Sequence, residues 1–189
     1  MRGYIFLILT TLFVTLTGCE NDDKTDPSVV GELDKQFILE AADDALFQVN
    51  AGQVVASRTT QDSIQKYGEE MTTDHTQAGK ELQTLAAARK VQLPTTLSDE
   101  RQQQLDSLSM QTGLGLDTLY LNQMVAVQGR VIRMMEIEGT SGKDTELKQW
   151  ASNRLPIVRQ FEERAKALRD SLRWRPGGPA TRRSGDPAV

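Results

Sequence analysis

The chain has 189 residues and a net charge of −4, which is enough length for one domain with its own hydrophobic core. Nucleic-acid binding depends on an excess of lysine and arginine, so this mildly acidic composition predicts no nucleic-acid partner. The chain contains one cysteine, which excludes an intrachain disulfide. Long runs rich in Ala, Leu, Gln, Glu, Lys and Arg, without strand-like alternation, predict an all-α protein.

Residues 1–18 have the design of a signal peptide. Arg2 precedes an apolar stretch, Ile5–Leu16, that is too short to cross a bilayer as a helix. The stretch ends in Leu16-Thr17-Gly18-Cys19, which resembles the lipobox of bacterial lipoproteins, where the cysteine becomes the lipidated first residue of the mature chain. We therefore expect Cys19 to attach the protein to a membrane. The alternative is an ordinary secreted protein with a spare thiol.

The segments on either side of the helical region are expected to be flexible. Residues 19–30 are polar and acidic, which favours a tether. No aspartate directly follows Cys19, so we expect the outer membrane, on its periplasmic side, while the acidic cluster that begins at Glu20 leaves surface exposure open. Residues 173–189 are rich in proline, glycine and arginine and are expected to form a disordered tail.

Between these segments, residues 31–172 carry apolar side chains at spacings of three and four, the period of an α-helix. The pattern predicts helices over residues 32–59, 61–90, 98–113, 118–138 and 144–172. The third of these is short, and Asp117 is expected to cap the fourth. Four long helices with short connections predict an antiparallel bundle that has a short extra helix before its third long helix.

Glycine and proline mark three expected breaks in this pattern. The short helix is expected to end near Gly113 and Gly115, and the segment 139–142, Gly-Thr-Ser-Gly, is expected to be a turn. Pro156 lies inside the last helical pattern. Proline removes a backbone hydrogen bond there, which predicts a kink or a split.

The chain's single histidine, His75, lies in the middle of an apolar stripe. The stripe consists of Ile64, Tyr67, Met71, His75, Ala78, Leu82 and Leu85. A neutral imidazole that is buried in a helical bundle needs a hydrogen-bond donor and an acceptor. We therefore interpret His75 as a core residue whose partners come from other helices.

Several segments of the chain match the pattern of one family. They are Phe37…Ala41-Ala42, the region of Gly52, Tyr67…Met71-Thr72-Thr73-Asp74-His75, Asp117…Tyr120-Leu121, Asp144…Trp150-Ala151 and Leu155-Pro156. Together they resemble a bacterial envelope family known only as a domain of unknown function and often labelled outer-membrane protein. The resemblance covers Leu33–Leu168. It implies a ferritin-like antiparallel four-helix bundle and brings no established activity.

This chain departs from the family at the positions that would form a site. Family members usually carry a glutamate where this chain has Gln48, and histidines where it has Gln128 and Phe161. The resemblance therefore implies that most metal ligands have been lost. We expect instead a polar core cluster in which Gln48 and Gln128 hydrogen-bond to His75 and Phe161 packs against it, with no cofactor.

Three functions remain open at this level. A ferritin-like di-metal site needs Glu-x-x-His pairs, and the chain has none, so we favour a non-enzymatic interaction or structural module. Its partners would be a membrane, through Cys19, and an unidentified envelope protein or cell-wall component. The alternative is a metal-binding or metal-oxidising protein that uses His75 with Glu70, Asp74, Glu136 or Glu138. A carrier of a small ligand is the third reading.

Overall fold

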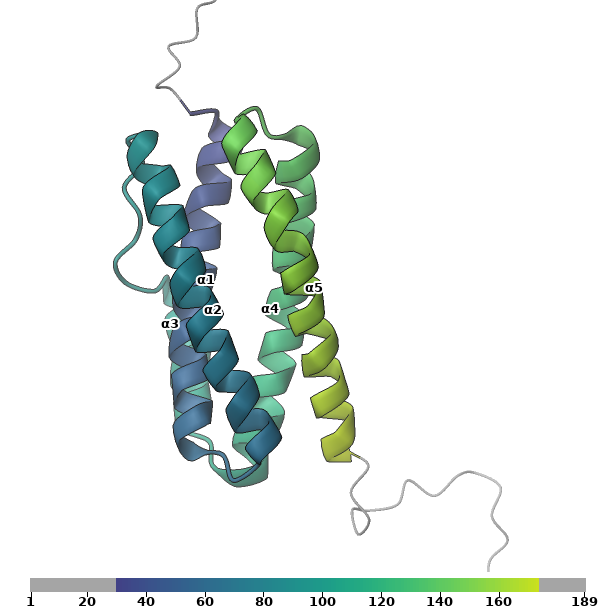
Figure 1. Cartoon of the computed structure of the whole chain (residues 1–189). Coiled ribbons are helices and arrows are strands. Elements are labelled where there is room, and N and C mark those ends of the chain that lie inside the picture. Colours follow the sequence, from purple (N-terminus) through teal and green to yellow (C-terminus); the bar gives the residue numbers. More distant parts are fainter. Residues whose placement is uncertain (1–29, 174–189) are drawn as a thin grey trace, which may run out of the picture.

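The computed structural model describes residues 30–173, and this part of the chain consists of helices without strands. The helices are α1 (Glu32–Arg58), α2 (Asp62–Ala88), α3 (Asp99–Ser109), α4 (Gly113–Ser141) and α5 (Thr145–Arg173). The prediction of an all-α bundle with one short extra helix is confirmed (Figure 1). The predicted signal peptide, the lipidation site Cys19, the tether up to residue 29 and the tail from residue 174 lie outside the described residues.

The four long helices form two antiparallel hairpins, α1–α2 and α4–α5, which pack against each other (Figure 1). Helix α1 contacts α2 and α4, and α5 contacts α4 and α2, so every long helix has antiparallel neighbours on two sides. Helices α2 and α4 run in the same direction, because residues 89–112, including α3, carry the chain back along α1. The bundle therefore has one long crossover connection.

One hydrophobic core fills the space between the helices. Its largest fully buried side chains are Ile38, Phe47, Ile64, Tyr67, Met71, Leu82, Leu108, Leu116, Tyr120, Leu121, Met124 and Leu147. All five helices contribute to this set, so none of them could leave without exposing apolar surface to water. At the centre, the Tyr67 ring packs edge-on against Tyr120 and Phe161, and its hydroxyl donates to the Phe161 carbonyl at 3.1 Å.

Polar contacts join three helix ends at one end of the bundle. A carboxylate oxygen of Asp34, at the start of α1, accepts hydrogen bonds from the backbone amides of Lys143 at 2.8 Å and Asp144 at 3.2 Å. Asp144 in turn accepts a hydrogen bond from Nε of Arg89, just after α2, at 2.7 Å. The start of α1, the end of α2 and the start of α5 are thereby held together.

The expected boundaries of α4 are wrong at both ends. The helix begins at Gly113 rather than Thr118, and Asp117 is a buried residue inside it rather than a cap. Gly113 adopts a φ of +54°, which glycine tolerates, so the chain can turn into α4 directly after the short connection of residues 110–112. At the other end the helix continues through the expected turn to Ser141, and a Cβ at Gly142 would lie only 2.4 Å from a carboxylate oxygen of Glu138.

Pro156 does not split the last helix, because α5 is continuous from Thr145 to Arg173. The residue faces solvent. Water can therefore reach the carbonyl group that loses its partner at the proline, and the cost of the missing hydrogen bond is small enough for the helix to continue.

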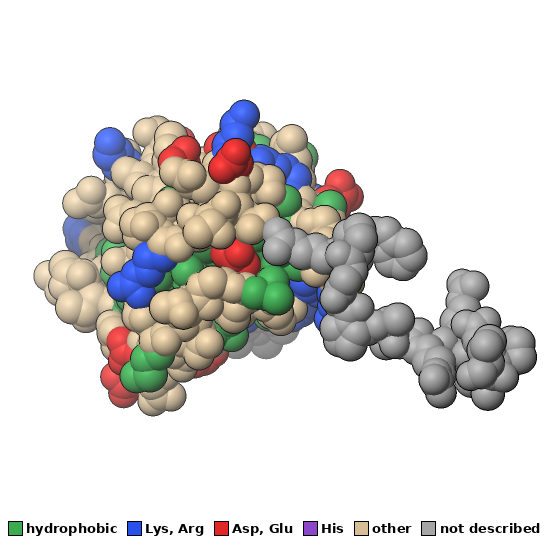
Figure 2. All heavy atoms as spheres, turned by 90° about the horizontal axis from the view of Figure 1, so that it is seen from below, with side chains coloured by type: hydrophobic (Ala, Val, Ile, Leu, Met, Phe, Trp, Pro, Cys, Tyr) green, Lys and Arg blue, Asp and Glu red, His purple; other side chains and the backbone are tan. Residues whose placement is uncertain are grey.

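At the end of the bundle that carries the turn between α1 and α2, apolar side chains occur as separate groups in a mostly polar surface (Figure 2). The exposed large apolar residues here are Met110, just after α3, and Leu114, in the first turn of α4. Scattered apolar residues of this kind are normal on a protein surface. We assign no function to this end.

Candidate functional site around His75

Helix α2 positions His75 by burying one face. Of the seven residues in the predicted stripe, all but Leu85 are fully buried and Leu85 is partly buried. The spacing of three and four places these side chains on one side of the helix, which faces α1 and α5. His75 is 4% exposed, so the expectation that it belongs to the core is met by its position.

The imidazole of His75 is held by its own helix. Nδ1 lies 3.1 Å from the carbonyl oxygen of Met71, one turn earlier. A carbonyl only accepts hydrogen bonds, so Nδ1 carries the proton of the neutral ring. Nε2 then carries the free lone pair, and no residue of the described range 30–173 donates a hydrogen bond to it.

The charge state of His75 is set mainly by burial, which lowers the pKa of the imidazole to about 4. The Asp74 carboxylate, 3.5 Å from Nδ1, raises this pKa, the Arg154 guanidinium lowers it, and the Met71 carbonyl raises it. The burial effect is the largest of these. The ring is therefore neutral at pH 7 and can act as a hydrogen-bond acceptor through Nε2.

The two expected glutamine partners bond to each other instead of to His75. The Gln128 side chain donates to Oε1 of Gln48 across the core, from α4 to α1, at 2.8 Å. The expected hydrogen bonds from these amides to the imidazole are therefore not formed, since the Gln128 amide is directed to Gln48 and the imidazole bonds to the Met71 carbonyl through Nδ1. The Phe161 ring does lie against the imidazole, with 5.8 Å between the ring centres.

His75 and Gln48 nevertheless face one small cavity of about 20 Å³ in the bundle interior. Asp44 and Arg154 also line it, and each keeps one buried polar atom, Oδ2 and Nε respectively, without a hydrogen-bond partner within residues 30–173. A space of this size accommodates one water molecule when polar groups surround it. Asp44 and Gln48 on α1, His75 on α2 and Arg154 on α5 thus form a polar layer in an otherwise apolar core.

Asp44 is a functional-site neighbour that the sequence analysis missed. Its buried carboxylate, on α1, accepts hydrogen bonds from Arg101 on α3 and Arg130 on α4. The Arg101 guanidinium also lies over the Phe47 ring, 4.9 Å from its centre. The only signal in the sequence was an acidic residue at a position where the helical spacing of α1 predicts burial. A buried charge requires a partner, so such a residue indicates a contact with a cation. The sequence offers no way to choose that partner.

Three carboxylates of the alternative metal site are bound by arginine side chains. Glu70 accepts from Arg164, Asp74 from Arg154 and Glu136 from Arg159 at 2.6 Å. No group of three His, Cys, Asp or Glu side chains within residues 30–173 is close enough to hold a metal ion. The structure therefore does not assemble these residues with His75 into a three-ligand site.

Glu138, the last residue proposed for that site, lies near Asp34 at the end of the bundle. Burial, and after it the neighbouring Asp34 charge, raise the pKa of its carboxyl to about 7. Asp34 already accepts the two backbone amides that join α1 to α5. Glu138 is therefore part of the contact between helix ends and is separate from the layer around His75.

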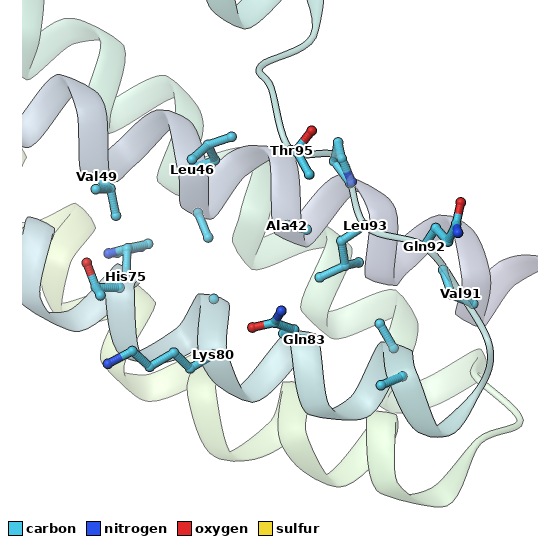
Figure 3. A pocket seen from close by; sticks show the side chains of 16 residues that line it. Ala42, Leu46, Val49, His75, Lys80, Gln83, Val91, Gln92, Leu93 and Thr95 are labelled. Atoms are coloured by element: carbon cyan, nitrogen blue, oxygen red, sulfur yellow. The ribbon is translucent and has the colours of Figure 1, made fainter.

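His75 also lies at one end of a surface groove of about 990 Å³ (Figure 3). The groove runs between α1 and α2 and is bordered by residues 91–95 of the connection that follows α2. In Figure 3, Leu93 reaches from that connection toward the two helices, and Gln83 reaches into the space between them. Two residues, Ala45 and His75, line both this groove and the interior cavity.

Comparison with known proteins adds a family and no activity. A family model described as "Domain of unknown function (DUF4142)" matches residues 21–168. No curated protein and no solved structure shows significant similarity to the chain. No helix within residues 30–173 has the length and the apolar composition that crossing a membrane requires.

Proposed function

The chain belongs to this family of unknown function, since the match covers most of its length, and we propose that it is a lipid-anchored bacterial envelope protein whose bundle is a non-catalytic binding module. Acyl chains on Cys19 would hold the bundle at the outer membrane, on the periplasmic side. An envelope protein or a cell-wall component would be the macromolecular partner.

One observation carries the non-catalytic part of this proposal. The carboxylates closest to His75 in the sequence, Glu70 and Asp74, are each bound by an arginine from α5. A carboxylate that acts as a general base or a metal ligand needs an oxygen lone pair that faces its substrate or ion. Here the carboxylates instead join α2 to α5, which supports a structural use of these charges.

The ferritin-like classification rests on connectivity. Ferritin-like folds are four-helix bundles with one long crossover between their two hairpins. The described part of this chain has one such crossover, residues 89–112. This supports the ferritin-like fold as part of the proposal, without the metal site that the name suggests.

The tether is compatible with a membrane position. Residues 20–31, twelve in number, separate Cys19 from the first residue of α1. A chain of this length reaches at most about 40 Å when fully extended. The bundle would therefore remain close to the bilayer, and more than one acyl chain would be needed for stable attachment.

The anchor is tested by expressing the full chain in a bacterium and measuring the mass of the mature protein, beside a Cys19→Ser variant. We expect loss of residues 1–18 and addition of acyl chains in the wild type. The variant should lose the modification and leave the membrane fraction. An unmodified Cys19 in a processed, secreted chain would refute the lipid anchor.

The non-catalytic assignment is tested by elemental analysis of the same protein, purified without a histidine tag. We expect no stoichiometric metal in the wild type or in a His75→Ala variant. One metal ion per chain that disappears in the variant, while circular dichroism shows an intact bundle, would favour the metal-handling alternative instead.

A further inference from the structure

The groove between α1 and α2 carries almost no charge, and its lining is mixed: apolar side chains form part of it, and Thr76, Gln83, Gln92 and Thr95 are polar. Its apolar lining includes Ala42, Ala45, Leu46, Val49, Ala86 and Leu93. The alanines leave the space open, because longer side chains at these positions would fill it. Lys80 is the only Lys, Arg, Asp or Glu among the described lining residues, and it stands at the exposed rim. The volume is at the upper end of the range for small-molecule sites.

A second observation, independent of the shape, gives this groove a polar end. His75 is more than nine-tenths buried and lines the groove (Figure 3). Its Nδ1 is bonded to Met71, which leaves Nε2 as an acceptor that no residue within 30–173 uses. An acceptor that is left free on a buried side chain at the wall of a groove favours a ligand that can donate a hydrogen bond.

We propose that the groove binds a small molecule with an aliphatic body and a hydroxyl group that donates a hydrogen bond to Nε2 of His75. The body would lie on the alanine-rich floor beneath Leu93, and the hydroxyl would reach the imidazole at the end of the groove. The proposal rests on the bundle being a binding module, but it does not depend on the lipid anchor at Cys19.

The protonation of His75 selects the head group. Because burial lowers its pKa, the imidazole stays neutral at pH 7 and its Nε2 only accepts. A carboxylate also only accepts, so it would meet the Nε2 lone pair without forming a hydrogen bond. An ether oxygen also has no proton to donate. An alcohol is the simplest group that satisfies the site.

The proposal can be tested with two isomeric probes, octanol and heptyl methyl ether, which have the same apolar size and differ in the donor. Because the chain has one histidine, the imidazole resonances in a ¹⁵N spectrum of the protein need no assignment. We expect octanol to shift the Nε2 resonance and to bind roughly tenfold more tightly than the ether, the effect of one buried hydrogen bond. Equal affinity, or binding without a shift at Nε2, would refute the proposal.

The location is tested with Gly79→Leu, which places a side chain in the groove. A Cβ at Gly79 meets no atom within 4 Å, so the variant should fold. We expect it to abolish octanol binding. The matched control is Gln77→Leu, because Gln77 is exposed on α2 and does not line the groove. Unchanged binding in Gly79→Leu would place the ligand elsewhere and contradict the proposal.

Octanoate with a Lys80→Met variant distinguishes selection by the imidazole from selection by the rim charge. We expect octanoate to bind the wild type more weakly than octanol, and Lys80→Met to leave octanol binding unchanged. Tighter binding of octanoate that is lost in the variant would show that Lys80 selects the ligand, and would overturn the role of His75. None of these outcomes depends on acylation or metal content, so failure here is distinguishable from failure of the proposed function.

Discussion

Arg154 on α5 binds the carboxylate of Asp74 on α2 through two of its guanidinium nitrogens, Nη1 to Oδ1 at 3.0 Å and Nη2 to Oδ2. Oδ2 of the same carboxylate lies 3.5 Å from Nδ1 of His75. The paired geometry fixes the position of the carboxylate and compensates its charge beside the buried imidazole. This ion pair therefore joins two long helices and also influences the proton affinity of the single histidine.

Replacement of Arg154 by methionine should weaken the fold and raise the pKa of His75 above about 4. The variant removes a positive charge that disfavours the imidazolium and leaves the Asp74 carboxylate that favours it. Because the pair is largely buried, the free energy of unfolding should fall by roughly 1–3 kcal/mol. Urea unfolding and a histidine NMR titration measure the two effects.

The control for this variant is Arg159→Met, which removes the Arg159–Glu136 ion pair between α5 and α4. Both side chains of that pair are about half exposed. The loss should be no more than about 1 kcal/mol, and the pKa of His75 should not change. Equal losses in the two variants would mean that burial does not strengthen the Arg154–Asp74 contact.

The buried imidazole should make the stability contributed by His75 depend on pH. In the unfolded chain the pKa is the ordinary value near 6.5, and in the folded chain it is about 4. Between these values the unfolded state binds more protons, so stability is lost as the pH falls from 6.5 toward 4. The expected loss is roughly 2–4 kcal/mol.

A His75→Phe variant separates the pH dependence caused by His75 from that caused by other groups. The carboxyl of Glu138, whose folded pKa is raised, contributes a dependence of opposite sign, since its stabilisation falls as the pH rises from 4.5 to about 7. It contributes equally to both proteins, so it cancels in their difference. Between pH 7 and pH 4 the wild type should therefore lose more unfolding free energy than the variant does. A gap that is the same at pH 7 and pH 4 would contradict a buried, neutral His75.

The hydrogen bond between Gln48 and Gln128 should appear as a strong coupling in a double-mutant cycle. Gln128→Met alone removes the donor and leaves the buried Oε1 of Gln48 unpaired, which costs roughly 1–3 kcal/mol. Methionine at both positions removes both polar groups and should recover most of that loss. Additive losses, measured by urea unfolding, would show that the two amides do not depend on each other.

Helices α1 and α2 approach each other closely at two glycines, and this contact should not tolerate a methyl group. A Cβ at Gly52 would lie 2.6 Å from Oγ1 of Thr72 and 2.7 Å from the carbonyl oxygen of Gly68. Gly52→Ala should therefore destabilise the protein by roughly 1–3 kcal/mol.

Gly79→Ala is the matched control on the same pair of helices. A Cβ at Gly79 has no neighbour within 4 Å, so the change removes only the entropic cost of glycine in a helix. It should stabilise the protein by roughly 0.5–1 kcal/mol. If both alanine variants were more stable than the wild type, α1 and α2 would have room for a methyl group at Gly52, which contradicts the close contact.

The sequence by itself determined the fold class, the number of helices and the buried face of α2. These properties follow from local rules, because the spacing of Ile64, Tyr67, Met71 and His75 defines one helix face wherever the helix later packs. Local rules were insufficient at Gly113, where a left-handed residue begins α4 earlier than expected, and at Pro156, where exposure to solvent allows the helix to continue.

Only the tertiary structure decided which side chains meet. His75 could be assigned to the core from its spacing, but its bond to Met71, the pairing of Gln48 with Gln128 and the contact of Arg154 with Asp74 could not. These partners depend on how far each helix is rotated and shifted against its neighbours. The groove between α1 and α2 has the same origin, since small side chains leave a space only where two particular helix faces lie opposite each other.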